Sequence, residues 1–222
     1  MSKILAVVGS SRTGKTRLIE RLIPELKRRG RTVAVIKHCP HGFLFDVEGK
    51  DSHRFFEAGA DAVAMAGPGM TAVVKRSAAV SDLYAVARAS FREADIVLVE
   101  GGKGITGFRK MEILRRGISE EPSSSSSELA ALVADFAAPS EKPVLDFENI
   151  PAIADFVEKI APDEADDVVL EVEGTPVPIK DFVRDFMKNT ILGMVRSLRG
   201  VKDHPRNVRI SIMSPGKEDE EP

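Results

Sequence analysis

Apolar runs alternate with amphipathic stretches along most of this chain. The run at 3–8 ends at Gly9, and apolar residues at three- and four-residue spacing follow over 15–29. A second apolar run covers 32–37, so the pattern predicts a strand, a helix and a strand joined by short connections. Such a βαβ unit places its two strands in parallel with a right-handed crossover.

Further elements of the same kind are predicted as far as residue 160. Strands are expected at 62–66, 71–75, 95–99, 110–114 and 129–134, and helices at 51–58, 81–94 and 150–160. The polar stretch at 118–127 ends in five consecutive serines and is predicted to be a mobile loop. The order of the elements indicates an α/β fold with a mostly parallel sheet flanked by helices.

The pattern changes after residue 162. The predicted elements there are two strands of a hairpin, an amphipathic helix and a last strand, at 168–172, 175–179, 181–199 and 207–212. We therefore expect a main domain over 1–162, a small α+β (ββαβ) appendage over 163–214 and an acidic disordered tail over 215–222.

The composition is that of a soluble protein of the cytoplasm. The net charge of −2 gives no basic field that would attract nucleic acid or an anionic membrane. The single cysteine, Cys39, cannot form an internal disulfide, and the apolar run at 4–8 is too short for a signal peptide or a membrane span. We expect a cytoplasmic protein that binds neither nucleic acid nor membrane.

Residues 9–16, GSSRTGKT, match the phosphate-loop pattern G-x-x-x-x-G-K-[ST]. In such a loop the backbone N–H groups point at phosphate oxygens, and glycines allow the close approach. Lys15 is expected to reach the β- and γ-phosphates, and Thr16 to ligate Mg²⁺. The residues predicted to surround the phosphates are Gly9, Ser10, Ser11, Arg12, Thr13, Gly14, Lys15, Thr16 and Arg17. The sequence thus predicts a P-loop NTPase fold that holds a purine nucleoside triphosphate with Mg²⁺.

The loop after 32–37 leaves a strand beside the phosphate loop, where ligands of parallel sheets bind. Asp46 and Asp51 are therefore candidate contacts for Mg²⁺, directly or through water. The crowding of His38, Cys39 and His41 supports another interpretation, a Zn²⁺ or Ni²⁺ site. An ordinary polar surface loop is a third interpretation.

The strand at 95–99 ends in Glu100 and Gly101, as in a Walker B strand. Glu100 is expected near the γ-phosphate, where it would position water or bind Mg²⁺, and Gly101 would allow close approach to the phosphate. The chain has no N-K-x-D tetrapeptide for guanine recognition. Asp135, which follows the strand at 129–134, is a candidate acceptor for a guanine edge, although aspartates also end strands for turn reasons alone.

Several blocks in this order resemble the molybdopterin-guanine dinucleotide biosynthesis adapter (MobB) family. Besides the phosphate loop, they are VIKHCPHGF, GKDSHRFFEAGA, LVEGGKG, RKMEILR and PVLDFENIPAIADFV. The resemblance covers residues 1–160. It implies a homodimer that binds GTP, hydrolyses it weakly and assists a partner enzyme, the guanylyltransferase that joins GMP to molybdopterin. Molybdopterin itself is a further candidate ligand.

The resemblance also implies roles for individual residues. Lys15 would neutralise charge on the β–γ bridge, and Glu100 would face the γ-phosphate. The second side of the site would be lined by Lys37, His38, His41, Asp46, Lys50, Asp51 and Arg54. Lys110, Glu112 and Arg115 would lie near the same pocket. Gly102 stands where the family carries a bulky aromatic residue, which is expected to loosen the pocket wall.

Two other functions remain open at this point. The His38-Cys39-Pro40-His41 cluster would suit a metallochaperone GTPase of the nickel-insertion type. A small-molecule kinase would need an arginine-rich lid, for which Arg115 and Arg116 are the comparable stretch. The appendage could dock a partner, bind pterin or cap the fold.

Overall fold

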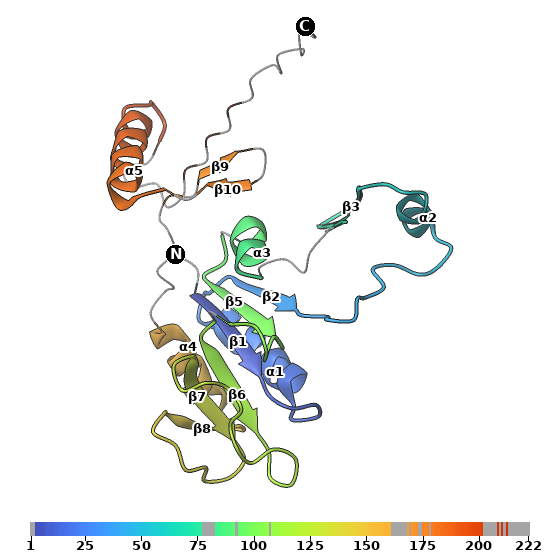
Figure 1. Cartoon of the computed structure of the whole chain (residues 1–222), viewed down its shortest axis with the longest axis vertical. Helices are drawn as coiled ribbons and strands as arrows, with labels where there is room; N and C mark the ends of the chain where they lie inside the picture. Colours follow the sequence, from blue (N-terminus) through green and yellow to red (C-terminus); the bar gives the residue numbers. More distant parts are fainter. Residues whose placement is uncertain are drawn as a thin grey trace, which may run out of the picture. The chain divides into compact units, whose positions relative to one another are not determined.

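A six-stranded parallel sheet is the centre of the first part of this computed structural model (Figure 1). Its order is β2-β5-β1-β6-β7-β8, and every neighbouring pair is parallel. The strands are β1 (Lys3–Val8), β2 (Val33–Lys37), β5 (Ile96–Glu100), β6 (Lys110–Leu114), β7 (Leu129–Ala134) and β8 (Val144–Asp146). Because all six strands run the same way, the loops that follow them meet at one edge of the sheet.

The structure describes residues 3–76, 83–91, 93–106, 108–160, 168, 170–172, 175–177, 179–201, 208, 210 and 212. The chain forms two compact units, Met1–Asp163 and Glu164–Pro222. The sheet belongs to the first unit, and its α/β fold is the one predicted from the sequence. Within the described ranges, no helix combines the length and the apolar character needed to cross a membrane.

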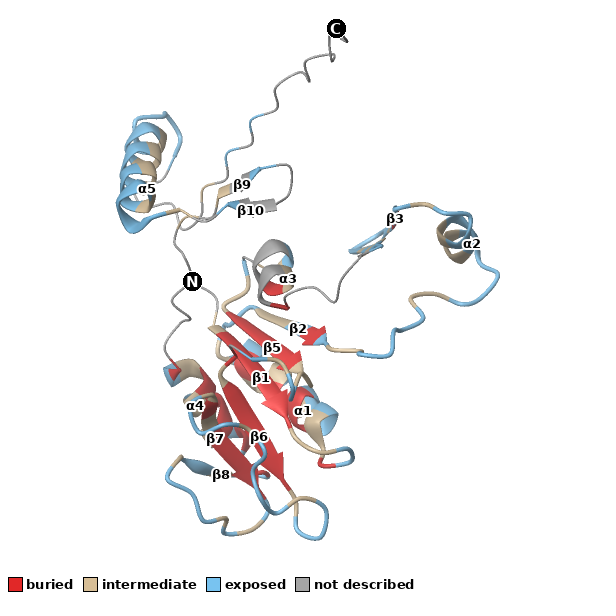
Figure 2. Ribbon diagram, in the orientation of Figure 1, coloured by how far each residue is buried: buried red, intermediate tan, exposed pale blue. Residues whose placement is uncertain are grey.

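The two faces of the sheet are covered differently. On one face, α1 (Lys15–Arg28) and α4 (Ile150–Lys159) pack on alternate residues of the central strands, in a cluster that includes Leu5, Ile113 and Phe147. On the other face, α3 (Leu83–Ser90) covers β2, β5 and β1. Figure 2 shows the buried central strands. Alternation along each strand produces these two apolar layers, since successive side chains point to opposite faces.

A loop, rather than a helix, joins β6 to β7. It covers the second face of these two strands, where Leu114, Leu129 and Leu132 form a small separate cluster. Lys110 and Glu112 lie on this same face and are buried, with exposed fractions of 2% and 0%. The loop therefore covers a face that carries charge as well as apolar surface.

A second, smaller sheet follows β2 in the chain. The strands β3 (Ala62–Gly67) and β4 (Met70–Lys75) pair antiparallel, and α2 (Asp51–Glu57) packs on β3. Together with residues 38–50 these elements form what we call the arm (residues 38–75). The arm exposes several large apolar side chains: Phe43, Leu44, Val47, Phe55, Met70 and Val73.

In its described residues, the second unit shows a short antiparallel hairpin and a helix. The hairpin is β9 (Leu170–Val172) with β10 (Thr175–Val177), and the helix is α5 (Asp181–Arg196). These confirm the predicted ββα order. Of the last predicted strand, at 207–212, three residues lie outside the described ones, and 208, 210 and 212 are not in a strand. The acidic tail at 215–222 also lies outside the described residues.

Most predicted elements occur within a residue or two of the expected ends. One strand, β8, was not predicted, because three residues are too few to show a periodicity. The helix predicted at 81–94 is shorter, and residues 81 and 82, at its expected start, lie outside the described ones. The strand predictions were strongest where burial on both faces gives a continuous apolar run.

Candidate nucleotide-binding site

The P-loop (residues 9–16) connects β1 to α1 and has a backbone that requires glycine. Gly9 and Gly14 have φ angles of 146° and 97°. A Cβ atom on Gly9 would lie 2.8 Å from the carbonyl oxygen of Ile113 and 2.9 Å from Oγ1 of Thr13. The buried Thr13 hydroxyl donates to the carbonyl oxygen of Ser10 at 2.9 Å, so this loop is closed from within.

Helix α1 carries basic side chains in its first turn, at the positive end of the helix dipole. A helix N-terminus normally favours acidic side chains, because the unpaired N–H groups carry partial positive charge. The first turn of α1 contains no acidic residue but carries Lys15 and Arg17, and the N-cap Gly14 has no side chain to accept a hydrogen bond. This arrangement leaves the first N–H groups to an external anion and fits a phosphate group.

Lys15 lies against the loop backbone. Its Nζ donates to the carbonyl oxygens of Gly9 and Ser10, at 2.9 and 2.8 Å. Burial lowers the pKa of Lys15, Glu100 opposes this shift, and Lys103 adds to it. The ammonium group is therefore held in the loop by carbonyl oxygens, which a phosphate oxygen can replace as acceptor.

The structure brings Thr16 and Glu100 together, two of the residues predicted to bind Mg²⁺. The Thr16 hydroxyl donates to Oε1 of Glu100 at 2.6 Å. Glu100 is the last residue of β5 and pairs in register with Val7 of β1 and Lys37 of β2. A hydroxyl beside a carboxylate is the kind of oxygen set that Mg²⁺ prefers, so the donor chemistry fits this ion.

The backbone after β5 lies beside the ends of β1 and β2. The His38 N–H donates to the carbonyl oxygen of Glu100, and the Gly101 N–H to that of Val7, both at 3.0 Å. Gly101 has a φ of 90°. Lys37, His38 and Gly101 are thus placed at the sheet edge that carries the P-loop, where the sequence predictions put them.

Gly102 follows directly and has a φ of 76°. The Cδ1 atom of Ile105 lies 3.5 Å from the position that a Cβ of Gly102 would take. An aliphatic side chain therefore packs beside this glycine. The expected loosening of the pocket wall stays a prediction.

Asp46 and Asp51 have partners within the arm. Asp46 accepts hydrogen bonds from the Ser52 hydroxyl and, at 2.7 Å, from the Val47 N–H, and these donors lower its pKa. Asp51 is exposed and lies 3.9 Å from Arg54. No contact described for these residues joins either carboxylate to Thr16 or Glu100, so their part in Mg²⁺ binding stays a prediction. The N-cap of α2 is Lys50, which makes no side-chain cap hydrogen bond.

The histidines and the cysteine after β2 do not form a metal cluster in the described part of the chain. No group of three or more His, Cys, Asp or Glu side chains there could hold a metal ion. Cys39 is a free thiol of intermediate exposure, and His41 is exposed. The geometry gives the metallochaperone interpretation no support.

Asp135, the candidate contact for the base, is held by the end of β6. Its Oδ2 accepts from Arg115 at 3.1 Å, and its Oδ1 from the backbone N–H of Arg116 at 3.0 Å. The Arg116 N–H is the leading cause of a lowered pKa at Asp135, and the Arg115 guanidinium contributes. The carboxylate is therefore charged and already accepts two hydrogen bonds.

The side chains of Lys110 and Glu112 hold segments that follow β5 and β6, and their implied place near the pocket stays a prediction. Lys110 Nζ donates to Glu128 at 2.8 Å and to the carbonyl oxygen of Lys103 at 3.0 Å. Glu112 accepts from the backbone N–H groups of Ser123 and Ser124 and from the Ser123 hydroxyl. A buried carboxylate thus holds two serines of the loop that was predicted to be mobile, which argues against its mobility at this point.

Several residues beside the P-loop were not predicted from the sequence. Ser119 Oγ lies 3.2 Å from Ser10 Oγ, and Phe147 packs under Gly14, whose Cβ position is 3.1 Å from its ring. Glu148 forms ion pairs with Arg17 and Arg21. The available signal was the pair Phe147-Glu148 directly after the short strand β8. Because β8 was not predicted, the sequence did not show that this pair lies beside the P-loop.

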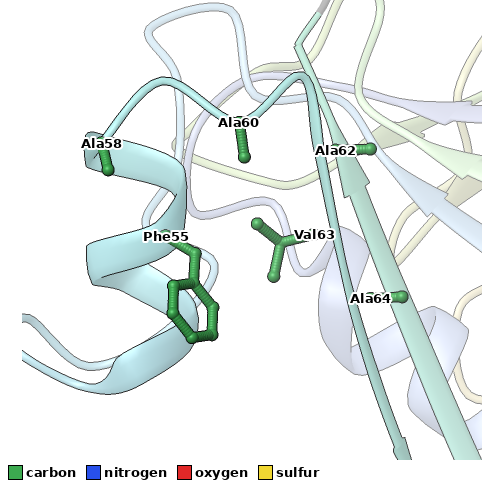
Figure 3. A pocket seen from close by; sticks show the side chains of 6 residues that line it. All are labelled: Phe55, Ala58, Ala60, Ala62, Val63 and Ala64. Carbon is green, nitrogen blue, oxygen red and sulfur yellow. The ribbon is translucent and has the colours of Figure 1, made fainter.

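An apolar hollow in the arm is distinct from this site. It has a volume of about 550 Å³ and is lined by Phe55, Ala58, Ala60, Ala62, Val63 and Ala64. Figure 3 shows the side chains of Phe55 and Val63 projecting into the space between α2 and the β3 strand. Its lining offers no charged group for phosphate, so the P-loop stays the candidate nucleotide site.

Known proteins match both the sequence and the fold. Residues 4–135 match the family described as MobB, molybdopterin guanine dinucleotide synthesis protein B. The molybdopterin-guanine dinucleotide biosynthesis adapter protein of Haemophilus influenzae is 35% identical over 156 residues, which are 70% of this chain and 87% of that protein. A putative protein of the same name from Methanocaldococcus jannaschii is 26% identical over 235 residues, with 95% of this chain and 97% of the relative covered.

The crystal structure of Bacillus subtilis MobB is similar at 26% identity and a TM-score of 0.58, and the match covers 73% of this chain and 99% of that chain. The family match includes the P-loop, Glu100 and Arg115, and it ends at Asp135. It spans more than half of the chain, and the relative from Haemophilus influenzae exceeds 30% identity with 87% of its length covered. The chain therefore belongs to the MobB family.

Proposed function

We propose that this protein is a GTP-binding adapter with weak GTPase activity that assists the attachment of GMP to molybdopterin. The names of its relatives, adapters of molybdopterin-guanine dinucleotide biosynthesis, support the pathway. The contact between Thr16 and Glu100, next to Lys15, is the observation that carries the nucleotide part. It joins a P-loop hydroxyl to a carboxylate at the end of the neighbouring strand, as Mg²⁺-dependent nucleotide binding requires.

Each residue of the site has a role in this proposal. The backbone of Ser10 to Thr13 and the first turn of α1 bind phosphate oxygens. Lys15 moves its hydrogen bonds from loop carbonyls to phosphate and neutralises charge that develops on the β–γ bridge. Thr16 and Glu100 would hold Mg²⁺, which would supply positive charge to the phosphates, and Glu100 would also position water. Arg115 donates to the carbonyl oxygen of Thr13, and this contact keeps that arginine away from the transferred phosphate, which agrees with slow hydrolysis.

The partners follow from the same proposal. The main partner is the molybdopterin guanylyltransferase, with molybdopterin as a further ligand, in the cytoplasm. The arm exposes several large apolar side chains, and a homodimer would cover them, which supports this oligomeric state. Light scattering of the purified protein tests this point, and a monomer at all concentrations would contradict it.

Nucleotide titration tests the central claim. Fluorescent GTP and ATP analogues are titrated with and without Mg²⁺ into the wild type, Lys15→Ala and Thr16→Ala. We expect GTP to bind about tenfold more tightly than ATP, a difference of one decade in Kd. Lys15→Ala should lose binding of both, and Thr16→Ala should lose the gain in affinity that Mg²⁺ gives.

Lys27→Ala is the matched control, since this lysine is exposed in the last turn of the same helix. Its affinity should equal that of the wild type. Equal affinity for GTP and ATP would refute the guanine preference, and the absence of binding to either would refute the proposal.

The kinase interpretation loses its main support in the structure. A lid arginine must be free to close over phosphates, whereas Arg115 is bonded to Thr13 and Asp135 and has a side chain only 18% exposed. The Arg116 guanidinium lies over the ring of Phe136, with 5.6 Å to the centroid. These contacts hold both arginines away from a lid role.

A further inference from the structure

Arg115 contacts three segments that are far apart in the sequence. Its Nε donates to the carbonyl oxygen of Thr13 in the P-loop at 3.2 Å. Its NH1 donates to Oδ2 of Asp135 after β7 at 3.1 Å. Its guanidinium lies over the ring of Phe147 after β8, 3.8 Å from the centroid. A planar cation with a fixed fork of donors is suited to joining such groups in one geometry.

The chain around Arg115 is held as rigidly as its side chain. The Arg115 N–H donates to the carbonyl oxygen of Ser119 and the Ser119 N–H to that of Arg115, which closes a tight turn around Gly117. Gly117 has a φ of 74°. Because Ser119 Oγ also reaches Ser10 Oγ at 3.2 Å, the turn touches the P-loop at two points.

Asp135 does not contact the P-loop in any interaction described for it. Both of its bonds go to the turn, one to the Arg115 side chain and one to the Arg116 backbone. A carboxylate has room for further donors, so Asp135 can accept a base N–H only by sharing oxygens that already hold the turn. Arg115 is then the connection between this carboxylate and the Thr13 carbonyl.

We propose that Arg115 is a positioning residue that couples Asp135 to the conformation of the P-loop. This inference rests on the proposed nucleotide site. It adds Arg115 as the residue through which Asp135, the candidate base contact, affects the phosphate-binding loop. A change at Asp135 alters the hold on Arg115, and therefore on Thr13, even when the ligand has no base. In energetic terms the two residues act as one unit on phosphate binding.

The test uses a ligand without a base, Mg²⁺-tripolyphosphate, titrated calorimetrically into the full chain. The variants are Asp135→Asn, Arg115→Lys and the double variant. Asparagine keeps an acceptor for the Arg116 N–H but removes the charge opposite Arg115, and lysine keeps the charge but lacks the fork. We expect Asp135→Asn to weaken binding about fivefold, Arg115→Lys about tenfold, and the double variant no more than Arg115→Lys.

Arg116→Ala is the matched control, because that side chain lies over Phe136 and has no described contact with the P-loop; its affinity should match the wild type. Unfolding of each variant is measured in parallel, and Arg115→Gln replaces Arg115→Lys if the latter does not fold. An unchanged tripolyphosphate affinity in Asp135→Asn would overturn the proposed coupling, and so would a double variant whose loss of affinity is the product of the two single losses. Neither result would count against the nucleotide site itself. A wild type that binds neither tripolyphosphate nor GTP would overturn the nucleotide site as well.

Discussion

Replacing Glu112 with glutamine tests how the loop after β6 is held. The Glu112 side chain is fully buried and accepts from the Ser123 N–H at 3.1 and 3.0 Å, from the Ser124 N–H at 2.9 Å and from the Ser123 hydroxyl. Burial by itself would raise the pKa of Glu112, but these donors outweigh burial and the pKa is lowered. The carboxylate is therefore charged at neutral pH and serves three donors at once.

The expected cost follows from those donors. Glutamine keeps one oxygen and turns an NH₂ group, itself a donor, toward the serine N–H groups. Hydrogen bonds to a charged group contribute about 1.5–3 kcal/mol each. In the variant one of these bonds is lost, and the remaining bonds go to a neutral acceptor and are weaker. Because Ser123 is exposed and can bond to water instead, we expect a loss of about 3 kcal/mol in total. For a chain of this size that lowers Tm by about 6–12 °C.

Thermal unfolding at neutral pH measures the loss, and a glutamate-specific protease reports on the loop through Glu120 and Glu121. The wild type should resist cleavage there, and Glu112→Gln should be cut. Glu141→Gln, at an exposed position on another loop, is the control and should behave as the wild type. Unchanged Tm and unchanged cleavage in Glu112→Gln would refute the view that this carboxylate anchors the loop.

Two further predictions concern stability. Arg12 has a φ of 65°, which strains a residue with a side chain, so Arg12→Gly should raise the free energy of unfolding by about 1 kcal/mol in urea titrations. Hydrogen bonds from Arg28 and Arg29 lower the pKa of Glu25 from 4.5 to about 2. The stability that Glu25 contributes is therefore present above pH 4.5 and is lost as the pH falls from 4.5 toward 2. Glu25→Gln should reduce this acid-dependent fall in Tm.

Both predictions have controls on neighbouring residues. Ser11→Gly should not stabilise the P-loop, because Ser11 does not have a positive φ. Glu20 lies at an exposed position of the same helix as Glu25, and Glu20→Gln should leave the acid-dependent fall in Tm as it is in the wild type. A destabilised Arg12→Gly, or an acid profile of Glu25→Gln identical to the wild type, would contradict the respective reasoning.

The elements of the candidate nucleotide site were predictable because their signals are local. Gly9, Gly14, Lys15 and Thr16 lie within eight residues, and their spacing states the chemistry directly. Glu100 ends an apolar run that marks a buried parallel strand, so its position at the sheet edge followed from the pattern. Its contact with Thr16 needed only the knowledge that parallel strands end at one edge.

The roles of Glu112, Arg115 and Asp135 were less predictable, for a common reason. Their partners are distant in sequence, and a charged residue within an apolar strand gives no sign of which loop will satisfy it. The serine run has the composition of a mobile loop, yet a buried carboxylate from the strand before it supplies the acceptors. Composition describes a segment by itself and cannot include such a partner.

The order of strands and helices along the chain, the phosphate-loop motif and the resemblance to a family could be read from the amino acids alone, since each depends on residues close together in the chain. The tertiary structure alone decided which faces the loop after β6 covers, which carboxylates are already bonded, and that Arg115 joins the P-loop to Asp135. These are consequences of the sheet order, which places β1, β6 and β7 side by side. Long-range pairing of this kind arises from packing and not from local pattern, so only the folded chain reveals it.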